Sequence, residues 1–539
     1  MNTRHSVLVI GNGPVGQTTA LLLARWGIPV LLLDRRPERD PAGSKAICQQ
    51  RDVLDVWNAV GAGQRIADEG VTWTTARTFY RDRELFAYSF HDRGDSPFPP
   101  FVNLSQARTE QILDERIAGE PLVDVRWGHE VTGIEQGADG VVLTCATSGG
   151  EVRVKGGWAV ACAGARGEAV RRMLGVGFGG RSFDDRFLIC DIRTDLPDWA
   201  DERRFYFDPA WNPGRQVLIH PSPDSTFRID WQVPAGYDPD AEEVSGALDA
   251  RIRAIIGDRD YEIVWKSVYR FHSRLADRMR VGRVLLAGDC AHLVSPFGAR
   301  GLNSGVQDAE NAAWKLAFVL HGWAGERLLD TYHDERHAAA VENLDVTGTT
   351  MRFLVPGDDE ERERRTSILE RAVRDETAWQ QVDSGRLAEP FWYSASPLTT
   401  PDPARPPAHR PERGHTPRPG PGVLVPDAPV AAFGRGTTRF RALARDGFLL
   451  LLCGNLDEAA IREAAAAASG APVRMLHLAR IDRTGALAEA LEVEEGQLWI
   501  IRPDAHVAAV LRNPDRTATL IALRRALGAY LSSSPGERA

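Results

Sequence analysis

The 539-residue chain is poor in cysteine, has no long apolar run and carries no excess of positive charge. Its six cysteines include no C-x-x-C pair, so we expect reduced thiols rather than disulfides. The longest apolar stretches, such as residues 20–33, contain an arginine or fall short of the roughly 20 residues that span a bilayer. No signal peptide is recognisable at the start, so we expect a cytoplasmic protein without a membrane partner.

The charge balance argues against a nucleic-acid partner. Lys and Arg total 65 against 74 Asp and Glu, for a net charge of −9 without a basic stripe. Hydrophobic residues (43%) and charged residues (26%) are present at ordinary globular levels. The chain is longer than the about 250–300 residues that one core supports, so we expect two or three domains. The composition therefore favours a folded protein that acts on small molecules, with no metal site expected.

A glycine pattern near the N-terminus predicts a dinucleotide site. Residues 5–34 have the spacing of strand, helix and strand, with Gly11, Gly13 and Gly16 between the first strand and the helix. The first glycine permits a tight turn, the second a close pyrophosphate and the third close packing of helix on strand. Asp34, roughly 20 residues on, is placed for ribose hydroxyls. The alternative is an ordinary strand-helix-strand unit with a tight turn.

A second motif, residues 282–316, is more specific. It consists of a buried strand, an acid at Asp289, a loop rich in proline and glycine, and a long periodic helix. The exposed N–H groups at residues 296–303 lie at the positive end of that helix and suit an electron-rich ring edge. One site for a pyrophosphate and one for a ring that takes up negative charge fit a flavin dinucleotide better than a nicotinamide dinucleotide.

With these motifs the chain resembles the single-component FAD-dependent aromatic hydroxylases, class A flavoprotein monooxygenases of the para-hydroxybenzoate hydroxylase superfamily. The resemblance covers residues 6–336 through its motifs, and residues 498–510 are similar to a strand of the C-terminal domain of phenylpropionate and polyketide hydroxylases. It implies an α/β fold with a Rossmann-like FAD-binding domain, an inserted β-sheet substrate domain and a C-terminal thioredoxin-like α/β domain. That last domain has Cys453 but no C-x-x-C pair, so we expect no redox role for it.

The expected domain boundaries follow from the resemblance and from shifts in composition. The chain divides into a discontinuous FAD-binding domain (1–75, 100–180 and 275–355), a substrate-binding sheet (76–99 and 181–274), a helical and proline-rich linker (356–419) and the thioredoxin-like domain (420–539). Within them, the spacing of Ile47, Val53, Leu54 and Trp57 predicts a helix over residues 45–64. The charge run at residues 358–365 predicts a solvated helix face.

The resemblance also implies which residues contact the cofactor. They comprise the turn that binds the pyrophosphate, the acidic residue that binds the ribose together with the residue after it, and polar positions that line the flavin and its phosphates. A loop that faces the pyrimidine edge of the flavin completes the set. Pro296 is implied beside the reacting edge of the ring. The full set is Gly11, Gly13, Pro14, Val15, Gly16, Asp34, Arg35, Lys45, Arg51, Gln106, Asp289, Pro296, Gly298, Arg300, Gly301, Leu302 and Asn303.

Two positions depart from the family pattern. Members usually carry an Asp-Gly pair where this chain has Ala163, and a serine is common where it has Gly167. In the family the acid supports binding of flavin and of reduced nicotinamide. FAD binding is still expected, whereas use of NADPH or NADH depends on compensation by Arg166 or Glu168. Residues 175–180 imitate a glycine fingerprint but follow a helix, so we interpret them as a loop, and NAD(P)H would bind transiently in a groove.

The reaction implied by the resemblance is hydroxylation of a phenolic or polycyclic aromatic substrate with NAD(P)H and O2 through a C4a-hydroperoxyflavin. The same fold also supports epoxidation, Baeyer-Villiger oxidation or dehydrogenation. A flavin-binding protein without NAD(P)H-driven turnover is the second alternative. A homodimer is implied by resemblance alone.

The β-rich region between residues 187 and 268 contains the candidate substrate contacts. Tyr206, His220 and Trp231 are aromatic or titratable positions in this region, and Tyr269 follows directly after it. Tyr206 or His220 is a candidate to assist deprotonation of a phenol, although a single histidine on a strand is more often structural.

Overall fold

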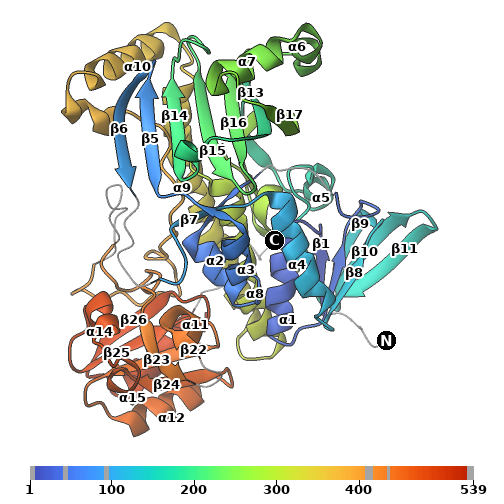
Figure 1. Cartoon of the computed structure of the whole chain (residues 1–539). Coiled ribbons are helices and arrows are strands. Elements are labelled where there is room, and N and C mark those ends of the chain that lie inside the picture. Colours follow the sequence, from blue (N-terminus) through green and yellow to red (C-terminus); the bar gives the residue numbers. More distant parts are fainter. Residues whose placement is uncertain (1–5, 41–45, 90–95, 407–416, 434–436, 531–539) are drawn as a thin grey trace.

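The computed structural model describes residues 6–40, 46–89, 96–406, 417–433 and 437–530. Its largest sheet, of eight strands, lies at the top of the view in Figure 1, and the C-terminal sheet lies at the lower left in orange and red. A six-stranded N-terminal sheet completes the three main units. None of the helices in these ranges is long and apolar enough to cross a bilayer.

The N-terminal sheet is parallel except for one edge strand and has the order β18-β19-β12-β1-β2-β8. β1, β2 and β12 are four-residue apolar runs with every residue buried, as in parallel strands covered on both faces. A ligand is expected at the carboxyl ends of such strands. The strands are β1 (Val7–Ile10), β2 (Val30–Leu33), β8 (Val123–Arg126), β12 (Trp158–Ala161), β18 (Arg280–Val281) and β19 (Val284–Leu286).

Three helices pack together against this sheet. α1 (Pro14–Arg25) contacts both α4 (Gln106–Ala118) and α8 (Arg300–Leu320). α8 begins at the proline- and glycine-rich loop and is buried along most of its length. A separate antiparallel sheet flanks the helices at the right of Figure 1 and consists of β9 (Glu130–Gly137), β10 (Gly140–Thr147) and β11 (Gly150–Gly156).

The helix predicted over residues 45–64 is wrong. The structure has a strand, β3 (Cys48–Gln50), followed by two short helices, α2 (Arg51–Asn58) and α3 (Gly63–Glu69). β3 pairs antiparallel with β7 (Phe101–Asn103), and that pairing overrides the local helical spacing. The second short helix starts at a glycine whose Cβ would lie 2.2 Å from the carbonyl oxygen of Leu54, so the chain turns sharply there.

The eight-stranded sheet has the order β20-β17-β13-β16-β15-β14-β5-β6. We call its two sides the inner face, which carries Phe187, Phe205 and Leu218, and the outer face, which carries Val217 and Trp231. The inner face packs on α9 (Asp330–Leu354) and α10 (Asp359–Ala372), the outer face on α7 (Ala247–Ile256). The strands are β5 (Thr75–Tyr80), β6 (Arg83–Ser89), β13 (Phe178–Thr194), β14 (Glu202–Phe207), β15 (Gln216–Ser222), β16 (Thr226–Val233), β17 (Tyr261–Ala276) and β20 (His292–Leu293).

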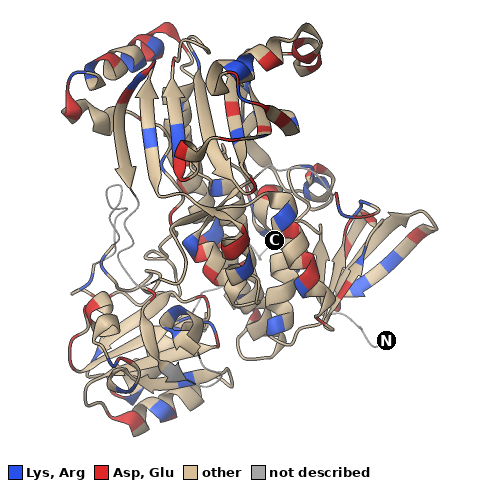
Figure 2. Ribbon diagram, in the orientation of Figure 1, with Lys and Arg blue, Asp and Glu red and all other residues tan. Residues whose placement is uncertain are grey.

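Part of the stretch predicted as a linker packs on this sheet. α9 (Asp330–Leu354) leads into α10 (Asp359–Ala372), where Leu369 and Ala372 are buried against the inner face. Most of the charged side chains of α10 are exposed, and acidic and basic residues are mixed along the helix (Figure 2). A charge run of this kind is therefore the solvent face of a helix whose apolar side covers the sheet.

The C-terminal sheet has the order β24-β23-β25-β26, with β23 and β24 parallel and the other neighbours antiparallel. Together with α12 (Glu458–Ala468) between the first two strands and α15 (Arg516–Ala526) after the last, this is a thioredoxin-like arrangement. Cys453 is buried at the end of β23. The strands are β23 (Phe448–Cys453), β24 (Val473–His477), β25 (Gln497–Ile501) and β26 (Val507–Arg512).

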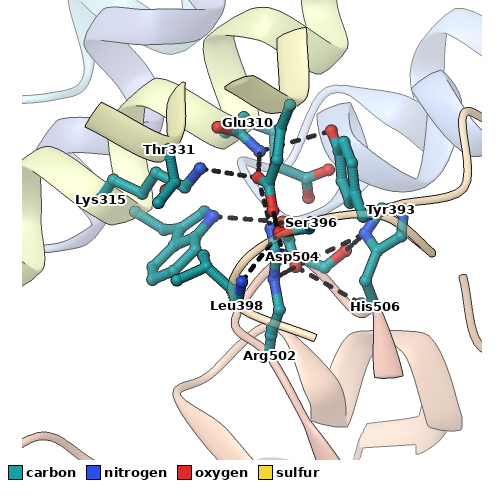
Figure 3. Close-up of polar contacts among 12 residues, drawn as sticks. Glu310, Lys315, Thr331, Tyr393, Ser396, Leu398, Arg502, Asp504 and His506 are labelled. Carbon is teal, nitrogen blue, oxygen red and sulfur yellow. Dashed lines mark hydrogen bonds and ion pairs between the residues drawn. The ribbon is translucent and has the colours of Figure 1, made fainter. Parts of the chain in front are cut away.

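A buried polar network joins this domain to α8 and α9 (Figure 3). The Glu335 carboxylate accepts hydrogen bonds from Lys315 Nζ at 2.6 Å and from Arg502 at 2.5 and 3.0 Å. Arg502 also pairs with Asp504, and all four side chains are at most 2% exposed. Burial alone would raise the pKa of Glu335, but the charges of Arg502 and Lys315 hold it well below its ordinary value. The network connects the C-terminal domain to α8, the helix that begins at the proline- and glycine-rich loop.

Candidate functional site

A cavity of about 770 Å3 extends from the β1–α1 turn to the inner face of the eight-stranded sheet. One end is lined by glycines and charged side chains, including Gly11, Gly13 and Asp34. The other end is lined by aromatic rings, including Phe187, Tyr269 and Phe271. The volume lies in the roughly 300–1,000 Å3 range of cofactor and ligand sites.

The glycines of the β1–α1 turn have different surroundings. A Cβ on Gly11, whose φ is +105°, would lie 2.3 Å from the carbonyl oxygen of Cys162, and one on Gly16 would lie 1.9 Å from the carbonyl oxygen of Gly11. A Cβ on Gly13 would meet nothing within 4 Å, and this residue lines the cavity together with Pro14 and Val15. No side chain caps the start of α1, so its N–H groups are available to an anion. This cradle fits a pyrophosphate.

Asp34 ends β2 beside the turn. Its carboxylate accepts hydrogen bonds from the backbone N–H of Asn12 at 2.8 Å and from the guanidinium of Arg36 at 3.0 Å. Burial would raise the pKa of Asp34, but these hydrogen bonds outweigh it and hold the pKa below its ordinary value. The carboxylate therefore stays ionised as an acceptor for hydroxyl groups. The sequence prediction named Arg35, which also lines the cavity, but missed Arg36.

The second motif forms the middle of the cavity wall. Asp289, Pro296, Gly298, Arg300, Gly301 and Leu302 all line it. Ala299 precedes α8 with a φ of +56° and no side chain caps the helix, so this N-terminus is also open to a ligand. A Cβ on Gly298 would lie 2.1 Å from the carbonyl oxygen of Arg386, which requires glycine there.

Three of the predicted cofactor positions lie away from the cavity. Gly16 packs against the turn, and Arg51 Nε donates to the carbonyl oxygen of Phe98 at 2.8 Å. Asn303 accepts from the backbone N–H of Gln50 and donates to the carbonyl oxygens of Cys48 and Ala299. None of these three lines the cavity, and Lys45 lies outside the described residues. Gln106 does line it and accepts from the N–H of Ala46 at 3.3 Å.

Ala163 and Gly167, the departures from the family pattern, both border the cavity. A Cβ on Gly167 would lie 2.7 Å from Cys290 Sγ, so a serine there would require the thiol to move. Of the two residues proposed to compensate for the missing acid, Arg166 lines the cavity, whereas Glu168 is exposed and pairs with Arg172.

Among the predicted substrate contacts, His220 and Tyr269 line the cavity, but Tyr206 and Trp231 do not. Both lie opposite Val217 in the strand register and therefore on the outer face. The phenol oxygen of Tyr206 accepts from Arg204 at 3.1 Å, and its ring stacks on Phe79. Because side chains alternate along a strand, aromatic content alone did not separate the two faces.

The sequence reasoning missed three charged residues on the inner face. Arg203, Arg228 and Asp230 come from β14 and β16 and line the cavity beside His220. Arg228 donates to both carboxylate oxygens of Asp191, at 2.8 and 2.9 Å. They lie on the same face of the sheet as Phe205 and Leu218, which can be recognised only when the strand register is known.

A family model described as "FAD binding domain" matches residues 4–347, more than half of the chain. The chain belongs to this family. A second model, "Aromatic-ring hydroxylase, C-terminal", matches residues 418–531. The residues that line the cavity all lie within the first of these regions, except Leu387.

Several proteins of known activity are similar to this member of the FAD-binding domain family. A 3-(3-hydroxy-phenyl)propionate/3-hydroxycinnamic acid hydroxylase of Mycobacterium sp. (strain JLS) is 30% identical over 66% of this chain and 61% of its own length. The chain thus spans about 60% of that relative. A rifampicin monooxygenase of Streptomyces venezuelae is 32% identical over 68% of this chain and 75% of its own.

Among solved structures, the flavin-dependent monooxygenase PieE in complex with FAD and substrate is similar along nearly the whole chain. The two superpose with a TM-score of 0.82 at 25% identity, covering 97% of this chain and 99% of PieE. The similarity includes the C-terminal domain as well as the cavity.

Proposed function

We propose that this protein is an FAD-dependent monooxygenase that hydroxylates a phenolic or polycyclic aromatic substrate with NAD(P)H and O2. The observation that carries the proposal is that the glycine cradle and the aromatic inner face line one and the same cavity. Two similar proteins are named as a hydroxylase of 3-(3-hydroxy-phenyl)propionate and a monooxygenase of rifampicin, and these names support monooxygenation as the reaction class.

FAD, when bound, supplies the redox and oxygen-transfer chemistry, which no protein side chain provides. In the proposal Gly13 and the N–H groups of α1 hold the pyrophosphate, and Asp34 accepts hydroxyl groups of the ribose. Asp289 and the N-terminus of α8 bind the remainder of the cofactor along the middle wall.

The aromatic end of the cavity orients the substrate and excludes water. Phe187 stacks on Phe271 with 4.5 Å between ring centroids, and Phe297 contacts both rings edge-on. Such rings present flat apolar surfaces to an aromatic substrate. A dry pocket also protects a reactive cofactor state from side reactions with water. Pro296, next to Phe297, is proposed to border the reacting edge.

The reductant is proposed to bind transiently, because no second glycine fingerprint follows a strand in the sequence. Arg166 is the proposed substitute for the family acid replaced by Ala163, since it lines the cavity.

A cytoplasmic location is proposed from the six free, buried cysteines. We further propose a homodimer, for which a solution mass near twice 59.3 kDa is the test.

The proposal is tested by NADPH and NADH oxidation by the FAD-loaded protein, with and without 3-(3-hydroxyphenyl)propionate, p-nitrophenol and rifampicin, with hydrogen peroxide measured alongside. Faster NAD(P)H oxidation with little peroxide and a product heavier by one oxygen atom is the expected result. A product with the oxygen in a ring ester or an epoxide identifies another oxidation of the same fold. If neither nicotinamide bleaches the flavin without oxygen, the protein only binds flavin and the monooxygenase proposal is wrong.

A further inference from the structure

The aromatic end of the cavity contains one polar corner. His220 on β15 lies opposite Arg228 on β16, and Asp230 lies two residues along the same strand, opposite Leu218. All of these side chains line the cavity on the inner face. Polar groups set among aromatic and aliphatic walls are the ones that orient a ligand.

Two atoms of this corner are buried without a hydrogen-bond partner among the described residues. They are Asp230 Oδ1 and His220 Nδ1. A buried polar atom without a partner is unfavourable and rare, so a ligand group that donates a hydrogen bond there would relieve the penalty. Arg228, by contrast, already donates to both oxygens of Asp191 on β13, so it is held in place.

The charges around Asp230 come from each neighbouring strand. Arg228 and Asp191 form an ion pair on β16 and β13, Arg203 lies on β14, and Tyr269 lines the cavity from β17. Burial raises the pKa of Asp230 to about 7, although Arg228 and Arg203 oppose the shift. Burial and the same two arginines lower the pKa of His220 well below its ordinary value, so the histidine is neutral near pH 7.

We propose that Asp230 is the proton acceptor for a ring hydroxyl group of the substrate. This inference rests on the proposed function and deepens it, because it names the group that the substrate must carry. The hydroxyl O–H bond breaks, a bond forms between its proton and a carboxylate oxygen of Asp230, and the electron pair stays on the ring oxygen. No electron is transferred in this step. The positive charges of Arg203 and Arg228 stabilise the resulting phenolate.

The substrate class follows from the same corner. A phenol with a free hydroxyl group donates to Asp230, whereas its methyl ether has no proton to donate. Activation of the ring by the phenolate oxygen then increases its reactivity toward an electrophilic oxygen donor. The protein is therefore expected to discriminate between a phenol and the corresponding methyl ether by at least about 100-fold in kcat/KM, in line with the contribution of a general base.

The test compares wild type with Asp230→Asn and Asp230→Glu across pH 5.5–9, using the fastest phenol among 3-(3-hydroxyphenyl)propionate, p-nitrophenol and rifampicin. In wild type, kcat/KM rises with pH as a carboxyl group of pKa near 7 ionises. Asp230→Asn is expected to lose this rise and about 100-fold in kcat/KM. Asp230→Glu is expected to restore part of the pH-dependent rise and part of kcat/KM. FAD content and NADPH oxidation without substrate monitor folding and the cofactor site.

Two control variants make the result specific. His220→Gln removes the imidazole of the corner and is expected to keep the pH-dependent rise, because this histidine is already neutral. Asp198→Asn makes the same chemical change at an exposed position of the same domain and is expected to behave as wild type. The inference is wrong if Asp230→Asn keeps the rise, or if His220→Gln removes it, while wild type hydroxylates the phenol. If wild type hydroxylates no phenol, the proposed function fails first and this inference fails with it.

Discussion

At the scale of single residues, the glycines of the β1–α1 turn are required for different reasons. Gly16 lies where a Cβ would sit 1.9 Å from a backbone oxygen, so the protein itself demands glycine there. Gly13 lies where a Cβ would meet no protein atom within 4 Å, yet it borders the cavity. The missing side chain at Gly13 therefore leaves room for a ligand, whereas the missing side chain at Gly16 is needed for the chain to fold this way.

A matched pair of substitutions separates these roles. Gly13→Ala is expected to fold with a nearly unchanged Tm but to bind FAD at least about tenfold more weakly, equivalent to about 1.4 kcal/mol, because the methyl group fills space needed by the pyrophosphate. Gly16→Ala is expected to lower the Tm of the apoprotein itself. Thermal unfolding and titration of flavin fluorescence measure both effects. Wild-type FAD affinity in Gly13→Ala would contradict the proposed cradle.

At the scale of elements, α8 connects the cofactor loop to the interior. Asp308, fully buried on this helix, accepts from the backbone N–H of Gly288 at 2.9 Å, from His292 at 2.7 Å and from Arg336 at 2.6 Å. One carboxylate thus holds the loop before Asp289, the strand β20 and helix α9. Burial would raise the pKa of Asp308, but the charge of Arg336 and the hydrogen bond with His292 hold it below its ordinary value.

Asp308→Asn is expected to destabilise the protein by about 3–5 kcal/mol, because Arg336 would remain buried with its charge uncompensated. FAD affinity is expected to fall as well, since Gly288 and the neighbouring Asp289 lose their anchor. Chemical denaturation and flavin titration test the two effects. The control is Asp345→Asn, the same change at an exposed position of α9, where neither effect is expected. Unchanged stability in Asp308→Asn would show that the carboxylate is dispensable.

At the scale of the whole molecule, the C-terminal domain is joined to the rest by buried charge. Glu335 belongs to α9, whereas Arg502 and Asp504 follow β25 in the thioredoxin-like domain. An ion pair of this kind stabilises only when complete, because removal of one partner leaves the other charged in a dry interior. The domain is thus expected to unfold together with the FAD-binding region.

Glu335→Gln is expected to lower the unfolding free energy at pH 7 by about 3–5 kcal/mol. Folding lowers the pKa of Glu335, so its contribution is present above its unfolded value of about 4.3 and is lost as the pH falls below that value. The Tm difference from wild type should therefore be constant between pH 7 and 5 and shrink below about pH 4. Glu494→Gln, at an exposed ion pair with Arg512, is the control and should change little. A difference that grows with acid would contradict the assignment.

The cofactor end of the cavity was more predictable than the substrate end. Local sequence pattern is enough to place the cofactor residues, because each follows a short buried strand. They are Gly11, Gly13, Asp34 and Asp289. His220 and Tyr206 were equally plausible in sequence, but strand register puts them on opposite faces of the same sheet. The register depends on how each strand pairs with its neighbours in the sheet, and a one-residue shift would exchange the two faces.

The amino-acid sequence by itself determined the strand-turn-helix units and the glycine turn of a dinucleotide site, because tight turns and buried parallel strands leave local patterns of glycine and apolar residues. Only the tertiary structure decided that Arg203, Arg228 and Asp230 meet His220 at the aromatic end of the cavity. It alone also decided that Glu335 and Arg502 meet in the interior. The physical reason is that desolvation and pairing depend on strand register and on which surfaces the folded chain brings together.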